Sequence, residues 1–255
     1  MTIIMRTTII LLLLILTTDM TYSQYPFEQY PSPTYKEYND WKFYDWSDTK
    51  QTLNHTLTID QFFDNKDVLT VQLTTLFPSE GDLSSVIRIF RNQTEIQKMT
   101  ESMFFSNLNT GHVPIRVADI NGDGLQDLKI VTSYLGNGIA GLNVNVIYLF
   151  QTKEGRFIKI SFSDKMISNR PERDVDGDGN YEIITMNLTG YERHNYWNFN
   201  LFEFDGKNLI NANKKEDYPI LIQYLYRKNY KITDKISRAK MKEFALELPD
   251  GYDKQ

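Results

Sequence analysis

The sequence predicts an all-β protein that is built from repeated four-stranded units and ends in a short helix. Several short segments alternate apolar and polar residues, which is the period of a half-buried strand. Two acidic loops begin at Asp119 and Asp174, 55 positions apart, and a similar order of strands follows each loop. Similar units at a fixed spacing are typical of repeat architectures, here a partial or small β-propeller-like fold.

The expected strands fall into three groups. Before the loops, 69–77 alternates clearly, 85–90 is β-branched and apolar, and 96–103 is a further element of uncertain type. This part has room for a degenerate unit without an acidic loop. Around and after the first loop we expect strands at 114–118, 128–134, 144–150 and 157–162, and with the second loop at 181–188, 196–204 and 218–226.

The helix is expected at the end of the chain. Met241, Phe244 and Leu248 recur at helical spacing after Ser237, which is a suitable N-cap, and before Pro249. The predicted division of the chain is therefore a signal segment at 1–24, an extension at 25–50, a β-rich domain at 51–235, and a helix and tail at 236–255.

The first 24 residues have the layout of a secretory signal peptide. Arg6 gives a positive start, 9–16 is continuously apolar, and a polar stretch follows. The alternative is an uncleaved membrane anchor, but the apolar run is shorter than the roughly 20 residues that span a bilayer. We expect a secreted or periplasmic protein that does not contact the membrane after cleavage.

The composition restricts how this protein is stabilised and what it binds. The chain has no cysteine, so an exported form has no disulfide and needs its core, a metal or a partner for stability. The net charge of −5 argues against nucleic acid and anionic membranes as partners.

The extension at 25–46 is rich in Tyr, Phe and Trp and contains three prolines, which favour extended backbone. Two interpretations stay open: an aromatic strip that docks a glycan or a protein, or a segment that buries its rings on the domain. The second is favoured.

Both acidic loops have oxygen-bearing side chains at positions one, three, five and nine and Gly at position six. This spacing can wrap a hard cation such as Ca²⁺. An EF-hand has a Glu at position twelve, where these loops have Ile130 and Thr185, and the residues after position nine are strand-like rather than helical. The alternative is a pair of Asn/Asp/Gly turns that hold no metal.

The pattern resembles the FG-GAP or VCBS repeat, the calcium-loop blade of integrin-α-type propellers. The resemblance covers about 113–204 and implies that each loop joins two strands of a blade. It implies side-chain ligands at Asp119, Asn121, Asp123, Asp127, Asp174, Asp176, Asp178 and Glu182, and backbone carbonyl ligands at Leu125 and Asn180. Glu182 departs from the usual Asp at position nine.

Charge leads to the same expectation. The first loop has three carboxylates and the second has four, and these repel one another without a cation. Extracellular calcium modules often bind with Kd of ~10⁻⁴ to 10⁻³ M. Calcium at ten times Kd would stabilise the fold by about 1.4 kcal/mol per site.

No pattern of catalytic residues is found. The three histidines are scattered, there is no Gly-x-Ser-x-Gly elbow, and the carboxylates that could form a glycosidase pair are better explained as ligands of a structural ion. We therefore expect a non-enzymatic binding module with an unidentified protein or glycan partner. The loops 135–141 and 191–197 are candidate contacts, although the second could equally be a solvated hairpin.

Two narrower functions remain possible. The chain is similar to small propeller-like periplasmic immunity proteins, which would make it an inhibitor of a lysozyme-type peptidoglycan hydrolase. A carbohydrate-binding accessory module that uses the aromatic extension is the other. The length leaves room for four or five small blades, a partial propeller completed by a partner, or an open sandwich of stacked sheets.

Overall fold

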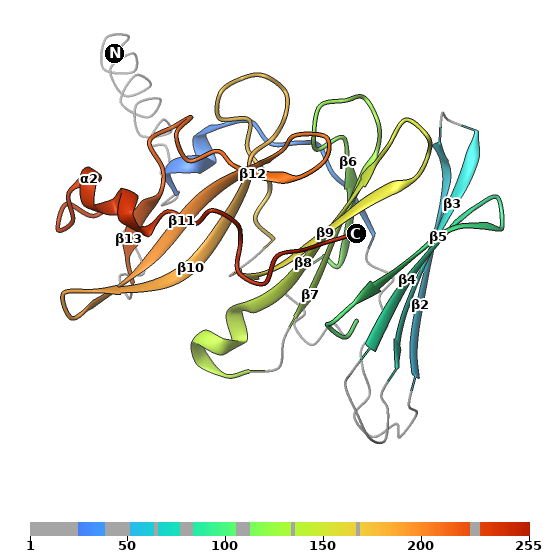
Figure 1. Cartoon of the computed structure of the whole chain (residues 1–255), viewed down its shortest axis with the longest axis horizontal. Coiled ribbons are helices and arrows are strands. Elements are labelled where there is room, and N and C mark those ends of the chain that lie inside the picture. Colours follow the sequence, from blue (N-terminus) through green and yellow to red (C-terminus); the bar gives the residue numbers. More distant parts are fainter. Residues whose placement is uncertain are drawn as a thin grey trace, which may run out of the picture.

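The computed structural model describes residues 25–38, 52–63, 66–76, 84–105, 113–133, 136–166, 169–224 and 230–255. It is mostly β-structure in three antiparallel sheets, which confirms the all-β prediction (Figure 1). The signal segment at 1–24 and residues 39–51, which include all four aromatic residues between 41 and 46, lie outside the described residues.

The first sheet is a meander of four neighbouring strands. It contains β2 (Thr52–Phe63), β3 (Asp67–Leu76), β4 (Ser84–Arg91) and β5 (Thr94–Glu101), in the order β2-β3-β4-β5. Leu69, Val71 and Leu73 of β3 are buried while the residues between them are partly exposed, as their alternation predicted. The uncertain element at 96–103 is thus the strand β5, whereas β2 had no clear sequence signal.

The central sheet has six strands in the order β1-β6-β7-β8-β9-β14. These are β1 (Lys36–Tyr38), β6 (Ile115–Ala118), β7 (Asp127–Ser133), β8 (Asn143–Gln151), β9 (Phe157–Lys165) and β14 (Asp253–Lys254). The short helix η2 (Gly138–Leu142) lies between β7 and β8. The four strands β6 to β9 were predicted, and two strands from the ends of the described chain extend this sheet.

The third sheet is arranged around its longest strand, β11. It contains β10 (Ile183–Tyr191), β11 (His194–Phe204), β12 (Leu209–Asn211) and β13 (Ile220–Gln223), and both β12 and β13 pair with β11. Glu192 and Arg193 have positive φ, so the tip of the hairpin 191–194 is a tight two-residue turn. Of the strand expected at 218–226, residues 220–223 form β13 and 218, 219 and 224 do not extend it, while 225 and 226 lie outside the described residues.

The three sheets are stacked face to face, with the six-stranded sheet in the middle (Figure 1). Leu128 and Ile130 of β7 belong to the core shared with the first sheet, and Val131 belongs to the core shared with the third. Every residue of β7 is buried for this reason. A sheet that is covered on both faces favours near-continuous apolar strands, as in β8, whereas β7 also buries the charged Asp127 and Lys129.

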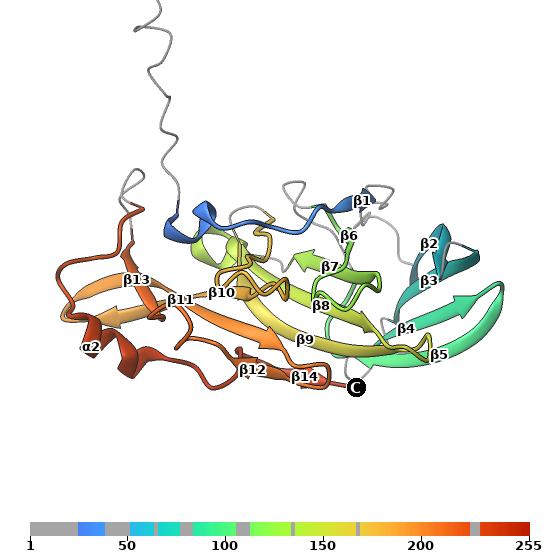
Figure 2. The ribbon, with the colours of Figure 1, turned by 90° about the horizontal axis from the view of Figure 1, so that it is seen from above.

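The N-terminal segment lies across the stack, on the side opposite to the C-terminal segment (Figure 2). Phe27, in the short helix η1 (Pro26–Gln29), is 2% exposed and belongs to the core of the third sheet. Tyr25 stacks on Phe27 with ring centroids 5.2 Å apart, and Tyr35 packs on the core between the central and third sheets. In its described part, 25–38, the extension therefore buries rings on the domain, as the favoured interpretation predicted.

The predicted helix at the end of the chain is wrong beyond its first turns. Ser237 caps α2 (Arg238–Met241) through a bond from the backbone N–H of Lys240, as expected, and η3 (Lys242–Phe244) follows. The backbone is already extended at Ala245.

Side chains of β11 hold the chain in this extended form. Asn198 donates to the carbonyl of Phe244 at 3.0 Å, and Asn200 accepts from the N–H of Leu246 at 2.9 Å. These bonds use backbone groups that a longer helix would pair internally. Hydrogen bonds to a neighbouring sheet thus replace the predicted helix through Leu248.

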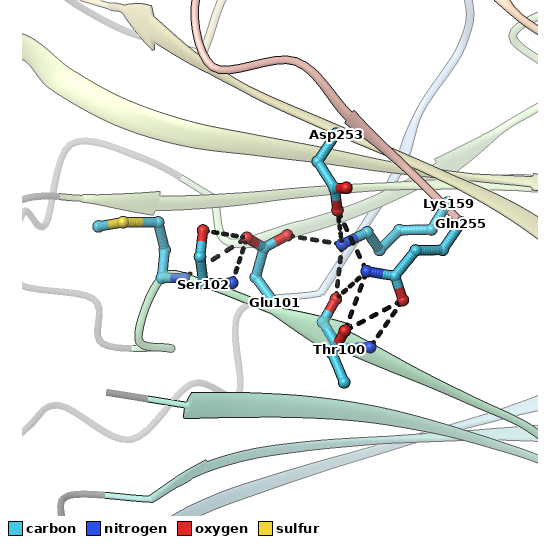
Figure 3. A network of polar contacts seen from close by, with 7 residues as sticks. Thr100, Glu101, Ser102, Lys159, Asp253 and Gln255 are labelled. Carbon is cyan, nitrogen blue, oxygen red and sulfur yellow. Dashed lines mark hydrogen bonds and ion pairs between the residues drawn. The ribbon is translucent and has the colours of Figure 1, made fainter. Parts of the chain in front are cut away.

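The last residues connect the central sheet to the first sheet (Figure 3). Backbone bonds join Gln255 to Lys159 of β9, and the Gln255 side chain bonds to the backbone N–H and carbonyl of Thr100 in β5. The buried ammonium of Lys159 contacts Glu101 at 3.2 Å and Asp253 at 2.7 Å. Strand β14 is therefore part of the contact between two sheets.

Candidate metal centre

The first acidic loop connects β6 to β7, and its last residue, Asp127, begins β7. Asp127 is fully buried, and its two oxygens accept backbone N–H groups of Ile120 and Gln151, each at 2.9 Å. Burial raises the pKa of Asp127 to about 7, although these two hydrogen bonds oppose the shift. The charge of Asp127 is thus costly unless a cation lies near it.

The other oxygens of this loop gather at its tip. Asp119 accepts the N–H of Gly124 at 2.9 Å through one oxygen, while its second oxygen is buried without a hydrogen-bond partner among the described residues. Asp123 accepts the N–H of Leu125 at 2.9 Å and lies 3.2 Å from the amide nitrogen of Asn121. Buried oxygens without partners are rare, so the free oxygen of Asp119 is a candidate ligand atom.

The second loop leads from the bridge between Arg173 and Glu182 into β10. Asp174, Asp176 and Asp178 each bring one oxygen into a group whose atoms lie within 4.8 Å of one another. Among the described residues this is the only set of three or more His, Cys or acidic side chains that converges in this way. The first loop uses Asn121 at its third position and has no such carboxylate triplet.

The glycines of the two loops have matching backbone conformations. Gly122 and Gly177, at position four, have φ of 72° and 79°, and Gly124 and Gly179, at position six, have φ of 85° and 86°. Residues with a Cβ rarely adopt such φ values, so glycine is favoured at both positions.

Hydrogen bonds repeat between the loops as well. The position-nine carboxylate accepts the N–H of position two at 2.9 Å in both loops: Asp127 from Ile120, and Glu182 from Val175. The position-five carboxylate accepts the N–H of position seven, which is Leu125 in the first loop and Asn180 in the second. The predicted carbonyl ligands Leu125 and Asn180 thus occupy equivalent places.

The loops also lie directly against each other. A Cβ at Gly122 would lie 2.4 Å from the carbonyl oxygen of Gly179, so only glycine fits there. The N–H of Tyr181 donates to the carbonyl of Ile120 at 3.0 Å. The sequence-predicted residues of both loops are therefore brought together as one unit between the central and third sheets.

The structure places a lysine side chain from another part of the chain among the carboxylates of the second loop, which the sequence did not predict. The ammonium of Lys215 is 2.8 Å from Asp176, 2.9 Å from Glu182, and 3.7 Å from Asp178. It is also 2.6 Å from Glu203 of β11, which lies outside the loop. Partial burial lowers the pKa of Lys215, but the hydrogen bonds to these carboxylates outweigh that effect and raise it above the ordinary value.

Lys215 and Glu203 could not be found from spacing. Lys215 follows Glu182 by 33 positions and lies in a turn after β12, and no motif links it to the loop. Its place depends on the pairing of β11 with β10 and β12. This pairing brings Glu203 close to the loop, where Glu203 and Asn180 form a hydrogen bond of 2.8 Å.

The donor set fits a divalent cation that prefers oxygen. Carboxylate, amide and carbonyl oxygens are the ligands that Ca²⁺ takes in proteins, usually six to eight of them. The first loop has three carboxylates, one amide and an unpaired oxygen, and among the described residues no cationic side chain reaches its carboxylates. The second loop has four carboxylates and one internal ammonium.

The fold and this pair of loops define an all-β protein with two tandem, conformationally equivalent acidic loops. No protein-family model matches the sequence, and no curated protein or solved structure is significantly similar to it. Among the described residues, no helix has both the length and the apolar character needed to cross a bilayer.

Proposed function

We propose that this chain is a secreted or periplasmic calcium-binding β-repeat protein that acts as a non-enzymatic binding module. The observation that carries the proposal is that the glycine φ angles, the ligand positions, and the hydrogen bonds of the position-five and position-nine carboxylates repeat in both loops. An acidic turn that formed by chance would not repeat this geometry.

The proposed ligands are the oxygen atoms of Asp119, Asn121, Asp123 and Asp127 in the first loop and of Asp174, Asp176, Asp178 and Glu182 in the second, with the carbonyls of Leu125 and Asn180. The ion supplies charge neutralisation and stiffens the loops. Because the loops touch each other between two sheets, this stiffening would stabilise the contact between the sheets.

The three sheets are proposed to be blades of a small or partial propeller. The support is that each sheet is built around a meander and that the central sheet packs on both neighbours. The strand order after each loop is also similar, since β7 and β10 each pair with the strand that follows.

The proposed partner is a protein or a glycan. A polar concavity of about 820 Å³, lined by the turn 213–218 and by Lys242, Ala245 and Glu247, has the size of a ligand site. In the loop 191–197, by contrast, Tyr196 and Trp197 are buried, so the surface open to a partner is the polar stretch from Glu192 to Asn195.

Calcium titration tests the proposal. Equilibrium dialysis of the purified protein against ⁴⁵Ca²⁺ should show binding at millimolar free calcium, and calcium should raise the melting temperature relative to EDTA. Mg²⁺ at the same concentration is the control and should give a smaller shift. A melting curve that is the same in calcium and in EDTA, with no bound ⁴⁵Ca²⁺, would falsify the metal assignment.

A further inference from the structure

We propose that Lys215 is a tethered counter-ion of the second loop, so that the first loop is the tighter calcium site and the second takes an ion only when Lys215 leaves it. This inference rests on the proposed function and adds a regulatory residue to it. Lys215 comes from outside the loop and is not one of the ligands that the loop pattern implies.

The distances carry the first step. The Lys215 ammonium lies within 2.9 Å of carboxylate oxygens of Asp176, Glu182 and Glu203, and 3.7 Å from Asp178. A cation bound by the loop would need the oxygens of Asp176, Asp178 and Glu182. The ammonium and the ion therefore compete for the same oxygens.

Burial carries the second step. Glu182 is fully buried and Glu203 is only 15% exposed at the side chain, so water cannot fully solvate these two charges. An uncompensated buried carboxylate is costly, and Lys215 removes this cost in the absence of metal. In the first loop, the buried Asp127 has no such cationic partner among the described residues.

The surroundings of Lys215 make its departure possible. Lys215 lines the concavity of about 820 Å³ and its side chain is 25% exposed, so there is space beside the loop for the ammonium. Glu216 and Glu247 line the same concavity, whereas Asp217 beside them is already paired with Arg238 at 3.1 Å and Lys242 at 2.9 Å. The lysine can thus exchange one acidic environment for another when a divalent ion enters the loop.

The test compares Lys215→Met with Lys214→Met. Lys214 is the neighbouring residue and lines the concavity, but no contact links it to the loop carboxylates, so its substitution changes the net charge equally. Equilibrium dialysis against ⁴⁵Ca²⁺ should find one tight ion per chain in the unsubstituted protein and in Lys214→Met, and two in Lys215→Met. Removing a positive charge a few ångströms from the ion should strengthen the second site at least tenfold.

Two further variants assign the ions to the loops. Asp123→Asn removes a position-five carboxylate from the first loop, and Asp178→Asn removes the equivalent one from the second. When Lys215 is present, Asp123→Asn should abolish tight calcium binding and Asp178→Asn should not. When either substitution is combined with Lys215→Met, the number of tightly bound ions should fall from two to one.

Lys215→Gln and Lys215→Arg are controls for the possibility that Lys215→Met does not fold. The Gln variant keeps a polar side chain and should also bind two ions, whereas the Arg variant keeps the charge and should bind one. The role of Lys215 would be overturned if the unsubstituted protein bound two calcium ions with equal affinity. It would also be overturned if Lys215→Met and Lys215→Gln each bound only one ion. Either result would leave the proposal of calcium binding intact. No calcium in any variant would instead overturn the proposed function, and this inference with it.

Discussion

Glu172 accepts hydrogen bonds from side chains of three separate parts of the chain. The hydroxyls of Tyr35 and Tyr148 donate to it, and the ammonium of Lys129 lies 2.7 Å away. Burial opposes the charge of Glu172, but Lys129 and the hydroxyls outweigh it and hold the pKa of Glu172 below its ordinary value. Because Lys129 and Glu172 are each 1% exposed at the side chain, neither charge has access to water.

Replacing Glu172 with Gln should destabilise the fold by about 3 kcal/mol, because it leaves the ammonium of Lys129 buried without a counter-charge. Urea unfolding followed by fluorescence measures the loss. The double variant Lys129→Met with Glu172→Gln removes both charges and should recover part of it. A double variant that is less stable than Glu172→Gln would contradict the explanation.

Gly122 and Gly124 have similar positive φ but different surroundings. A Cβ at Gly122 meets the backbone of Gly179, whereas a Cβ at Gly124 meets nothing within 4 Å. Gly124→Ala should therefore cost only the left-handed strain of about 1 kcal/mol, and Gly122→Ala should cost about 3 kcal/mol, since overpacking adds to the strain. Equal losses in urea unfolding would show that the loops do not touch as described.

At the scale of elements, Asp127 makes both the stability of the first loop and its calcium binding depend on pH. Its pKa in the ion-free fold is about 7, above the ordinary 3.8. The folded state therefore binds this proton more tightly than the unfolded state. The stability that the proton provides is complete below pH 4 and is lost as the pH rises to about 7.

Calcium needs the charged carboxylate and so competes with this proton. The rise in melting temperature that saturating calcium gives over EDTA should be larger at pH 8 than at pH 5. Differential scanning fluorimetry at both pH values measures it. Asp123→Asn, which weakens the same site, should reduce the difference between the two pH values, and a larger calcium effect at pH 5 would speak against Asp127 as a ligand.

Gln255, which follows β14, contributes an amide side chain to the contact between the central and first sheets. Gln255→Ala removes the hydrogen bonds to the backbone N–H and carbonyl of Thr100. We expect a loss of about 1 kcal/mol and faster amide exchange in β5. Lys254→Ala is the matched control, because the Lys254 ammonium bonds instead to Asn208, in the turn between β11 and β12. If the amides of β5 exchanged at the same rate in both variants, the Gln255 side chain would not be what connects β5 to the central sheet.

The elements that the sequence predicted well are those whose structure depends on residues within the element rather than on contacts with distant residues. β3, β7, β8 and β11 alternate or are continuously apolar, and the acidic loops carry glycine where φ is positive. β2 was missed because its outward residues include Asn54, Thr56 and Thr58, which suit an exposed face but give a weak apolar signal. The helix was extended too far because Asn198 and Asn200, more than 40 positions earlier, hold the backbone after Phe244.

The candidate site likewise contains residues that a local sequence pattern predicts and residues that only the packing of the chain brings in. Its ligand positions are local in sequence, and all ten fall in the two loops that the structure brings together. Lys215 and Glu203 are contributed by the packing of a later turn and strand, so no local pattern could identify them.

At the scale of the whole molecule, the loops lie at one of the two contacts between sheets. The core between the central and third sheets contains Ile120 of the first loop and Ile183, which follows the second. Among the described residues, the core between the first and central sheets contains no residue of either acidic loop. Removing calcium should therefore loosen one contact of the stack and leave the other unchanged.

Hydrogen exchange measured by mass spectrometry can locate this change. In EDTA, peptides that cover 119–127, 174–182 and the start of β10 should exchange faster than in calcium, because loop amides such as those of Ile120 and Val175 bond to carboxylates that an ion would fix. Peptides of β3 and β4 should exchange equally in both conditions and serve as the internal control. Faster exchange throughout all three sheets would instead mean that the molecule unfolds as one unit and that the ion does not act at a single contact.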